Sequence, residues 1–285
     1  MNLKKIILSA DSSCDLGPEL KSRYGVNYSR FHVLLDGRSY IDGLDLTSND
    51  IFSIYRQKKC LPKTAAIGVG EYYETFKKWT DQGFEVIHIN LSSAISSTHQ
   101  NCCIAASELE GVYPIDSKNL STGMGQLIIE AAKRIELGMP ARQIQEEIVN
   151  LRDKVQTSFI LDTLDFLCAG GRCSMLSAMG ANILKLKPCI EVNNTSGTMS
   201  VGKKYRGSLE KVAIQYIDER LADRDLINTD RLFITHAFQS PELLEKVYDY
   251  IKNLEIFKEI YITDTGCSIS SHCGPNTFGL AFLSK

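Results

Sequence analysis

The chain has 285 residues, of which 44% are hydrophobic, so it can form one large or two moderate domains with proper cores. Its 32 Lys and Arg residues nearly balance its 34 Asp and Glu residues, which leaves a net charge of −2. Because no basic block exceeds a pair or two, we do not expect nucleic acid to be a partner.

The amino terminus, M-N-L-K-K-I-I-L-S-A, places two lysines before a short apolar run that ends at Asp11. That run is too short for a signal peptide. No later stretch reaches the roughly 18 apolar residues that a membrane span needs, so we expect no transmembrane segment. The sequence therefore predicts a cytoplasmic protein.

Nine cysteines in such a chain are interpreted as reduced thiols rather than as a disulfide framework. No C-x-x-C spacing occurs, and the nearest clusters combine His99 with Cys102 and Cys103, or His272 with Cys267 and Cys273. Neighbouring residues on a helix or strand point in different directions, which makes one tetrahedral zinc site difficult to build from these residues. We expect no metal site.

The first half of the chain alternates strand and helix patterns, which is typical of a Rossmann-like parallel sheet covered by helices. Strands are expected at 5–10, 29–35, 86–91 and 112–115, and helices at 48–58, 71–82, from 97 onward, 125–137 and 141–155. We assign residues 1–155 to this N-terminal α/β domain. Ligands bind at the carboxyl ends of strands in such sheets.

The second half predicts a mixed α+β domain at residues 156–274, which gives a two-domain α/β protein with a cleft between its domains. A strand is expected at 158–161 and a hairpin at 187–203, whose turn is N-N-T-S-G-T. Helices follow at 209–221 and 241–254, and strands at 231–235 and 259–263. The last apolar run, 279–283, is expected to return to the first sheet, so residues 275–285 would join the N-terminal domain.

Loops rich in hydroxyl groups are the most informative local feature. The longest, N-L-S-S-A-I-S-S-T-H-Q at 90–100, directly follows a predicted strand. Four other loops share its character: A-D-S-S-C-D at 10–15, P-K-T-A at 62–65, I-D-S at 115–117 and S-T-G-M-G at 121–125. Such loops supply hydrogen-bond donors for a carboxylate or a phosphate, and one small anionic group would explain them together.

Nucleotide binding and hydrolysis find little support in the motifs. The G-x-G at Gly123 and Gly125 lacks the third glycine of a dinucleotide fingerprint, because Ile128 stands there, and no Walker motif occurs. No G-x-S-x-G elbow is present either. His272 lies in a loop of small residues and could be a general base, a neutral donor beside an anion, or a structural residue. An acyl or phosphoryl transferase or hydrolase that uses His272 as its base therefore remains the alternative function.

Eight motifs follow one another along the chain: A-D-S-S-C-D-L, P-K-T, S-S-A-I-S-S-T-H-Q, I-D-S, S-T-G-M-G, L-D-T-L-D-F-L-C-A-G-G-R, L-K-L-K-P and H-C-G-P-N-T-F-G. Their order resembles the DegV family of bacterial fatty-acid-binding proteins. This resemblance implies a carrier rather than an enzyme. It implies that one long-chain fatty acid, palmitate-like or oleate-like, binds between two domains without a cofactor. It also implies that a separate ATP-dependent kinase phosphorylates the carboxylate.

Positions that match the family motifs suggest site residues. Thr64 and Ser96 match the two hydroxyls that hold the fatty-acid carboxylate. Arg172 and His272 match polar positions near the head group or phosphate, and we expect Ser93 and Ser97 there as well. Lys203 and Arg206, beside Lys204, form a small basic patch that could dock the kinase.

The chain departs from the family pattern in three loops. It has T-A-A-I-G at 64–68, where members often have T-S-Q-P-S, and I-S-S-T-H-Q at 95–100, where they have L-S-G-T-Y-Q. It also has Asn276 in place of a usual glycine. These changes concern the geometry around the head group and the preferred acyl chain more than the fold.

Overall fold

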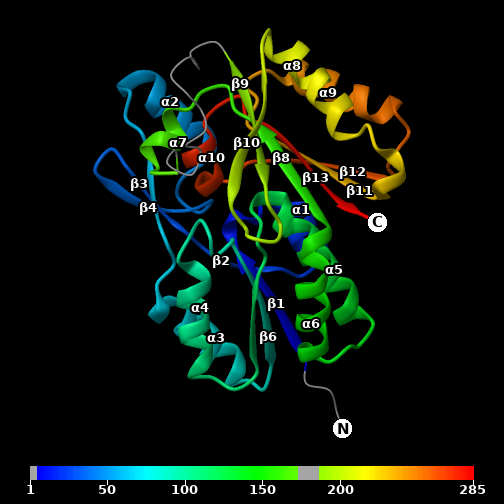
Figure 1. The fold of residues 1–285 in the computed structure, drawn as a ribbon. Coiled ribbons are helices and arrows are strands. Elements are labelled where there is room, and N and C mark those ends of the chain that lie inside the picture. The colour runs from blue at the N-terminus through cyan, green and yellow to red at the C-terminus, as the bar shows by residue number, and fades with distance from the viewer. Residues whose placement is uncertain (1–4, 173–185) are drawn as a thin grey trace.

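The computed structural model describes residues 5–172 and 186–285, which form a mixed α/β fold with two larger sheets (Figure 1). The first sheet is parallel and has the strand order β2-β1-β6-β7. Its strands are β1 (Ile6–Asp11), β2 (Asn27–Ser29), β6 (Glu85–Asn90) and β7 (Val112–Asp116). Ala10 of the central strand β1 pairs with Tyr28 and Ile89 on its two sides.

Helices cover both faces of this sheet, as the alternating pattern predicts (Figure 1). The helices α3 (Val69–Thr80) and α4 (Thr98–Ser107) lie on one side, and α5 (Ser121–Glu136) and α6 (Ala141–Leu151) lie on the other. The short helix α1 (Gly17–Arg23) and the 3-10 turn η1 (Ser12–Cys14) follow β1. The expected α/β class is therefore confirmed.

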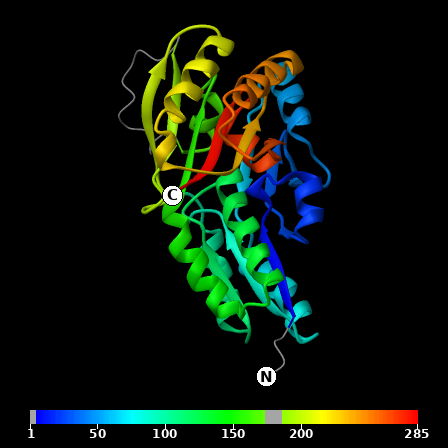
Figure 2. The same cartoon turned by 90° about the vertical axis from the view of Figure 1, so that its right-hand side faces the viewer.

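The second sheet is mixed and has the order β10-β9-β8-β13-β11-β12. Its strands are β8 (Val155–Ile160), β9 (Lys187–Val192), β10 (Met199–Tyr205), β11 (Ile227–His236), β12 (Glu259–Asp264) and β13 (Phe278–Ser284). Helices α8 (Leu209–Arg220) and α9 (Pro241–Asn253) lie together along one face of it (Figure 2). Short 3-10 turns precede β8 and β11, namely η2 (Arg152–Lys154) and η4 (Arg224–Leu226).

The expectation that residues 275–285 return to the first sheet is wrong. The strand β13 pairs antiparallel with both β8 and β11, so it lies inside the second sheet. Six of its seven residues are buried, as expected for a central strand covered on both faces. An apolar run indicates burial on both faces, but it does not indicate which sheet the strand joins.

A small third sheet and three helices lie beside the junction of the two larger sheets (Figure 1). The sheet has the order β4-β3-β5, with β3 (His32–Leu35), β4 (Arg38–Ile41) and β5 (Lys63–Ala65). The helices are α2 (Ser48–Lys58), α7 (Asp165–Ala169) and α10 (Cys267–Cys273). The single strand expected at 29–35 is therefore two strands in different sheets, since β2 ends at Ser29 and β3 begins at His32.

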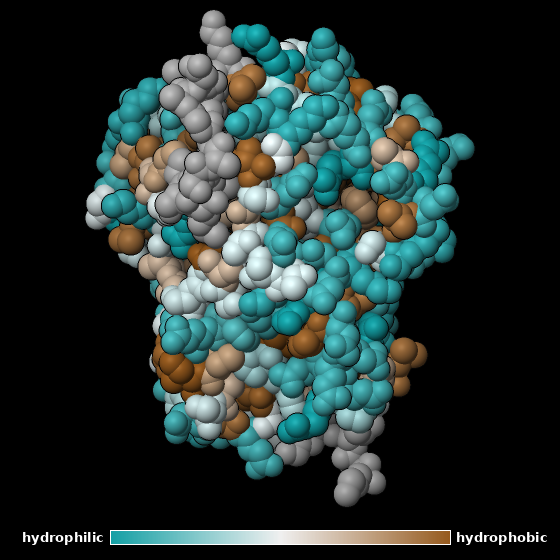
Figure 3. All heavy atoms as spheres, in the orientation of Figure 1, coloured by the Kyte–Doolittle hydropathy of each residue, from teal (hydrophilic) through white to brown (hydrophobic). Residues whose placement is uncertain are grey.

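The surface in Figure 3 carries hydrophobic residues in small groups among hydrophilic ones. Within the described part of the chain, no helix combines the length and the apolar character that crossing a bilayer requires.

Seven of the described cysteines are free thiols, whereas Cys168 is disulfide-bonded, so the interpretation as reduced thiols fails at that residue.

Candidate functional site

A cavity of about 230 Å³ lies where the three sheets meet. Its polar lining comes from hydroxyl groups, one histidine and one arginine: Ser13, Thr64, Ser96, Ser97, Ser268, Arg172 and His272. Its apolar wall includes Leu91, Ile95 and Leu120 from the first half of the chain, and Phe159, Leu167 and Met199 from the second. The cavity therefore combines polar side chains with an apolar wall.

Thr64 and His272 form the best-defined polar pair of this cavity. Thr64 lies on β5 and His272 on α10, and 2.8 Å separates the Oγ1 of Thr64 from the Nε2 of His272. The Nδ1 of His272 is buried and has no hydrogen-bond partner among the described residues. Burial, together with the positive charge of Arg172, lowers the pKa of His272 to about 4. The imidazole is consequently neutral at pH 7.

Two packing contacts explain the position of His272. Gly170, the first glycine of G-G-R, packs so closely on the ring that a Cβ there would lie 2.2 Å from its Nδ1. The start of α10 is held by Asp42, whose carboxylate accepts hydrogen bonds from the Cys267 N–H (2.9 Å) and the Ser268 hydroxyl (2.7 Å). The G-G-R and H-C-G-P motifs are therefore parts of one packed unit.

Ser96 and Ser97 lie where the hydroxyl-rich loop turns into α4. The Oγ of Ser96 accepts a hydrogen bond from the Thr98 N–H (3.2 Å), which supports the first turn of the helix. A hydroxyl can accept one hydrogen bond and donate another, so Ser96 can still donate into the cavity. Ser97 is the N-cap residue, and its side chain makes no capping hydrogen bond.

Arg172 brings a positive charge to the same cavity. Its guanidinium donates to the backbone carbonyls of Gly170 (2.6 Å) and Ile95 (2.9 Å), which fix its position without neutralising its charge. Burial lowers the pKa of Arg172 below its usual value, but an arginine remains protonated at neutral pH. The region around Thr64 and His272 is consequently electropositive.

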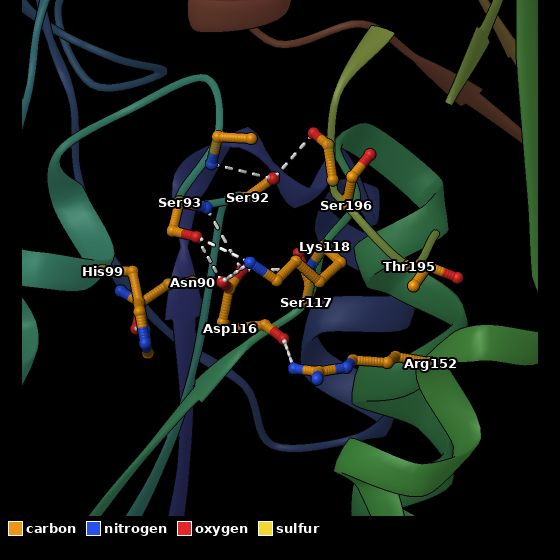
Figure 4. Close-up of polar contacts among 12 residues, drawn as sticks. Asn90, Ser92, Ser93, His99, Asp116, Ser117, Lys118, Arg152, Thr195 and Ser196 are labelled. Carbon is orange, nitrogen blue, oxygen red and sulfur yellow. Dashed lines mark hydrogen bonds and ion pairs between the residues drawn. The ribbon is translucent and has the colours of Figure 1, made fainter. Parts of the chain in front are cut away.

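The other predicted residues lie outside this cavity. Ser93 donates to the Oδ2 of Asp116 (2.5 Å) and accepts from Lys118 (2.9 Å), in a polar cluster at the ends of β6 and β7 (Figure 4). The I-D-S loop belongs to that cluster and not to the cavity. Lys203 lies on the exposed hairpin, where it forms an ion pair with Glu219, and Arg206 follows it at the end of β10.

Two lining residues, Ser13 and Ser268, were not singled out from the sequence. Ser13 belongs to the A-D-S-S-C-D loop, which the hydroxyl pattern had indicated as a whole. Ser268 lies on α10, a short helix of small residues whose sequence shows no recognisable helical pattern of apolar residues. In the part of the chain that the structure describes, no group of three or more His, Cys, Asp or Glu residues could hold a metal ion.

Comparison with known proteins identifies the family of this chain. Residues 5–285 match the family described as uncharacterised protein, DegV family. This chain belongs to the DegV family. A DegV domain-containing protein of Clostridium perfringens is 28% identical over 99% of this chain and 100% of its own length.

Solved structures of similar proteins share the fold over nearly the whole chain. One is described as fatty acid binding of a DegV family protein from Thermus thermophilus, with a TM-score of 0.89 and 25% identity over 99% of this chain and 100% of that one. Another is a stearic-acid-binding protein from Eubacterium ventriosum, with a TM-score of 0.83 and 25% identity over 99% of both chains. The two-part DegV architecture expected from the sequence is confirmed.

The environment of His272 predicts an unusual titration. In ligand-free protein, NMR of the His272 ring should show a protonation midpoint of about pH 4 instead of 6.5. The native state then binds this proton more weakly than the unfolded state, so the stability contributed by this group falls as the pH decreases from 6.5 to about 4. Arg172→Gln should raise the midpoint, because it removes a positive charge beside the ring. A wild-type midpoint near 6.5 would contradict this description of the cavity.

Proposed function

We propose that this DegV protein binds one long-chain fatty acid in the cavity and holds its carboxylate with Thr64 and Ser96. The observation that carries this proposal is the Thr64 hydroxyl backed by a neutral, buried His272, in a cavity that also has an apolar wall. The fatty-acid-binding relatives from T. thermophilus and E. ventriosum support the ligand class. No cofactor is needed for this function.

The head group is bound through directed hydrogen bonds. If the Nε2 of His272 carries the proton, it donates to Thr64, and the Thr64 hydroxyl is free to donate to a carboxylate oxygen. Ser96 supplies a second donor, and the charge of Arg172 favours the ionised acid. Hydrogen bonds to a charged acceptor contribute about 1.5–3 kcal/mol each, and an unpaired buried carboxylate would be costly.

The hydrocarbon tail supplies most of the affinity. About 15 methylenes leaving water contribute on the order of 12 kcal/mol before ordering costs, at roughly 0.8 kcal/mol each. A second, small cavity of about 20 Å³ shares Leu120, Phe159, Ile269 and Cys273 with the first. We propose that the tail extends between these shared residues, which must move apart to admit a long chain.

A separate ATP-dependent kinase would act on the bound acid. In this proposal the protein is a carrier, Arg172 neutralises charge on the acyl phosphate, and Ser97 lies at the exposed start of α4 near the head group. Arginine suits a phosphate because its planar fork donates two parallel hydrogen bonds. Since Lys203 is already paired with Glu219, Arg206 is the stronger candidate for kinase docking.

The alternative, a transferase or hydrolase with His272 as its general base, fits the geometry less well. A general base works best when its pKa lies near the operating pH, and the pKa of His272 is lowered to about 4. Its Nε2 is also engaged with Thr64, which makes His272 a better hydrogen-bond donor than a proton acceptor.

Removing the hydroxyls tests the head-group proposal. Thr64→Val and Ser96→Ala should each weaken palmitate or oleate binding about tenfold to a hundredfold in calorimetry on delipidated protein, because each loses one charge-assisted hydrogen bond. Ser107→Ala is the matched control, since its hydroxyl lies at the far end of α4 and bonds only to the Ile104 carbonyl among the described contacts. Unchanged affinity in both site variants would refute the assignment.

A charge reversal tests the kinase docking. Arg206→Glu should lower the rate at which a fatty acid kinase of the same cells phosphorylates the bound acid, and it should leave fatty-acid affinity unchanged. Arg224→Glu is the control, because Arg224 is exposed in η4, outside this basic patch. If both variants support the wild-type rate, the basic patch has no role in docking.

A further inference from the structure

Ser92 is a buried serine at the start of the hydroxyl-rich loop, and its backbone and side chain are both engaged in hydrogen bonds. Its N–H donates to the carbonyl of Asn119 (2.9 Å), and its own carbonyl accepts from the N–H groups of Ile95 (3.1 Å) and Ser96 (3.2 Å). Its Oγ accepts from the Ala94 N–H (3.2 Å). Ser92 does not line the cavity, so any effect that it has on the cavity passes through its neighbours.

The hydroxyl of Ser92 also reaches the second half of the chain. It donates to the carbonyl of Gly197 (2.8 Å), in the turn between β9 and β10. Gly197 has a φ of +75°, and a Cβ at this position would lie 2.2 Å from the Ser92 Oγ, so the close approach requires a glycine. Figure 4 shows Ser92 beside the turn that carries Thr195 and Ser196. The loop and the turn are therefore joined through one buried hydroxyl.

Two residues of the candidate head-group site depend on the turn that Ser92 forms. The bond from the Ser96 N–H to the Ser92 carbonyl fixes the backbone of Ser96, whose side chain lines the cavity. Ile95, in the same turn, presents its carbonyl to the guanidinium of Arg172 (2.9 Å). The conformation of this turn consequently determines where one hydroxyl donor and the positive charge lie relative to each other.

The turn between β9 and β10 has a second attachment that does not involve Ser92. The side-chain amide of Asn194 donates to the backbone carbonyls of Asp153 (2.6 Å) and Val155 (2.8 Å). These bonds hold the turn against the start of β8. If the bond between Ser92 and Gly197 is lost, we therefore expect the loop that contains Ser92 to move and the turn to stay in place.

We propose that Ser92 is a positioning residue of this site, an inference that rests on the proposed fatty-acid binding. Ser92 does not touch the acid; it holds the turn at 92–96 so that Ser96 and Arg172 converge on one carboxylate. The alternative is a purely structural role, because serine hydroxyls commonly bond to a backbone N–H two residues further on in turns. A purely structural role predicts a loss of stability without a change in the recognition of the carboxylate.

The hydroxyl of Ser92 is the group whose removal should displace the turn. Ser92→Ala breaks the bond from the Ala94 N–H and leaves the carbonyl of the buried Gly197 without this donor. An unpaired buried backbone group is costly, so the loop is expected to move until the carbonyl reaches another partner. That movement displaces Ser96 and the Ile95 carbonyl, whereas the apolar wall from the second sheet stays in place.

The test compares the affinities of delipidated protein for palmitate and for 1-hexadecanol, which has the same chain but no carboxylate, by displacement of a fluorescent fatty acid. Ser92→Ala should weaken palmitate binding about tenfold, the effect of one misplaced charge-assisted hydrogen bond, and leave 1-hexadecanol binding within about twofold. Ser9→Ala is the matched control: Ser9 is fully buried on β1, its Oγ lies 2.9 Å from the Nδ1 of His88, and it does not line the cavity. It should change neither affinity.

Two further variants sharpen the test. In a Ser96→Ala background, Ser92→Ala should reduce palmitate affinity by a smaller factor than in the wild type, because part of its effect acts through Ser96. If Ser92→Ala does not fold, Ser92→Cys takes its place, since a thiol forms weaker hydrogen bonds at the same position and should change the two affinities in the same direction.

Equal weakening of palmitate and 1-hexadecanol binding, or a palmitate affinity equal to that of Ser9→Ala, would overturn the positioning role and leave fatty-acid binding in place. Wild-type protein that does not bind palmitate would overturn the proposed function and this inference together.

Discussion

Two buried carboxylates hold the start of α10, and the candidate site depends on them. Asp42 accepts hydrogen bonds from the Cys267 N–H and from the hydroxyls of Ser12 (2.7 Å) and Ser268, and Asp15 accepts one from the Gly266 N–H (2.8 Å). The bonds to Gly266, Cys267 and Ser268 join segments that are more than 200 residues apart in the chain. Because α10 carries His272, they help to bring that ring to Thr64, so the Thr64–His272 pair forms only when these distant segments are packed together.

The electrostatics of the cavity suit one anionic head group. His272 is kept neutral by its burial and by Arg172, while Arg172 keeps its charge and bonds only to carbonyls among the described contacts. A single positive charge and several hydroxyl donors can satisfy one carboxylate without leaving a buried charge unpaired. In the proposed function, the apolar wall contacts the hydrocarbon tail, so that the tail supplies affinity and the head group sets the orientation.

Local patterns in the sequence predicted most helices and strands, but they predicted fewer of the contacts between these elements. The helix at 48–58 and the hairpin around N-N-T-S-G-T agree with α2 and with β9 and β10, since capping and turn residues act locally. Which sheet β13 belongs to, and whether β2 and β3 are one strand or two, depend on pairing with strands that are distant in the sequence. Motif matches placed Thr64, Ser96, Arg172 and His272 in one cavity, whereas the contact between Thr64 and His272 spans 208 residues and leaves no local signal.

Native mass spectrometry of protein purified from bacterial cells tests whether the cavity holds one fatty acid. The spectrum should show a stoichiometric adduct that dissociates on denaturation, and organic extraction should identify it as a long-chain fatty acid. Protein that carries no adduct and that also fails to take up added palmitate or oleate would show that the cavity is not a fatty-acid site.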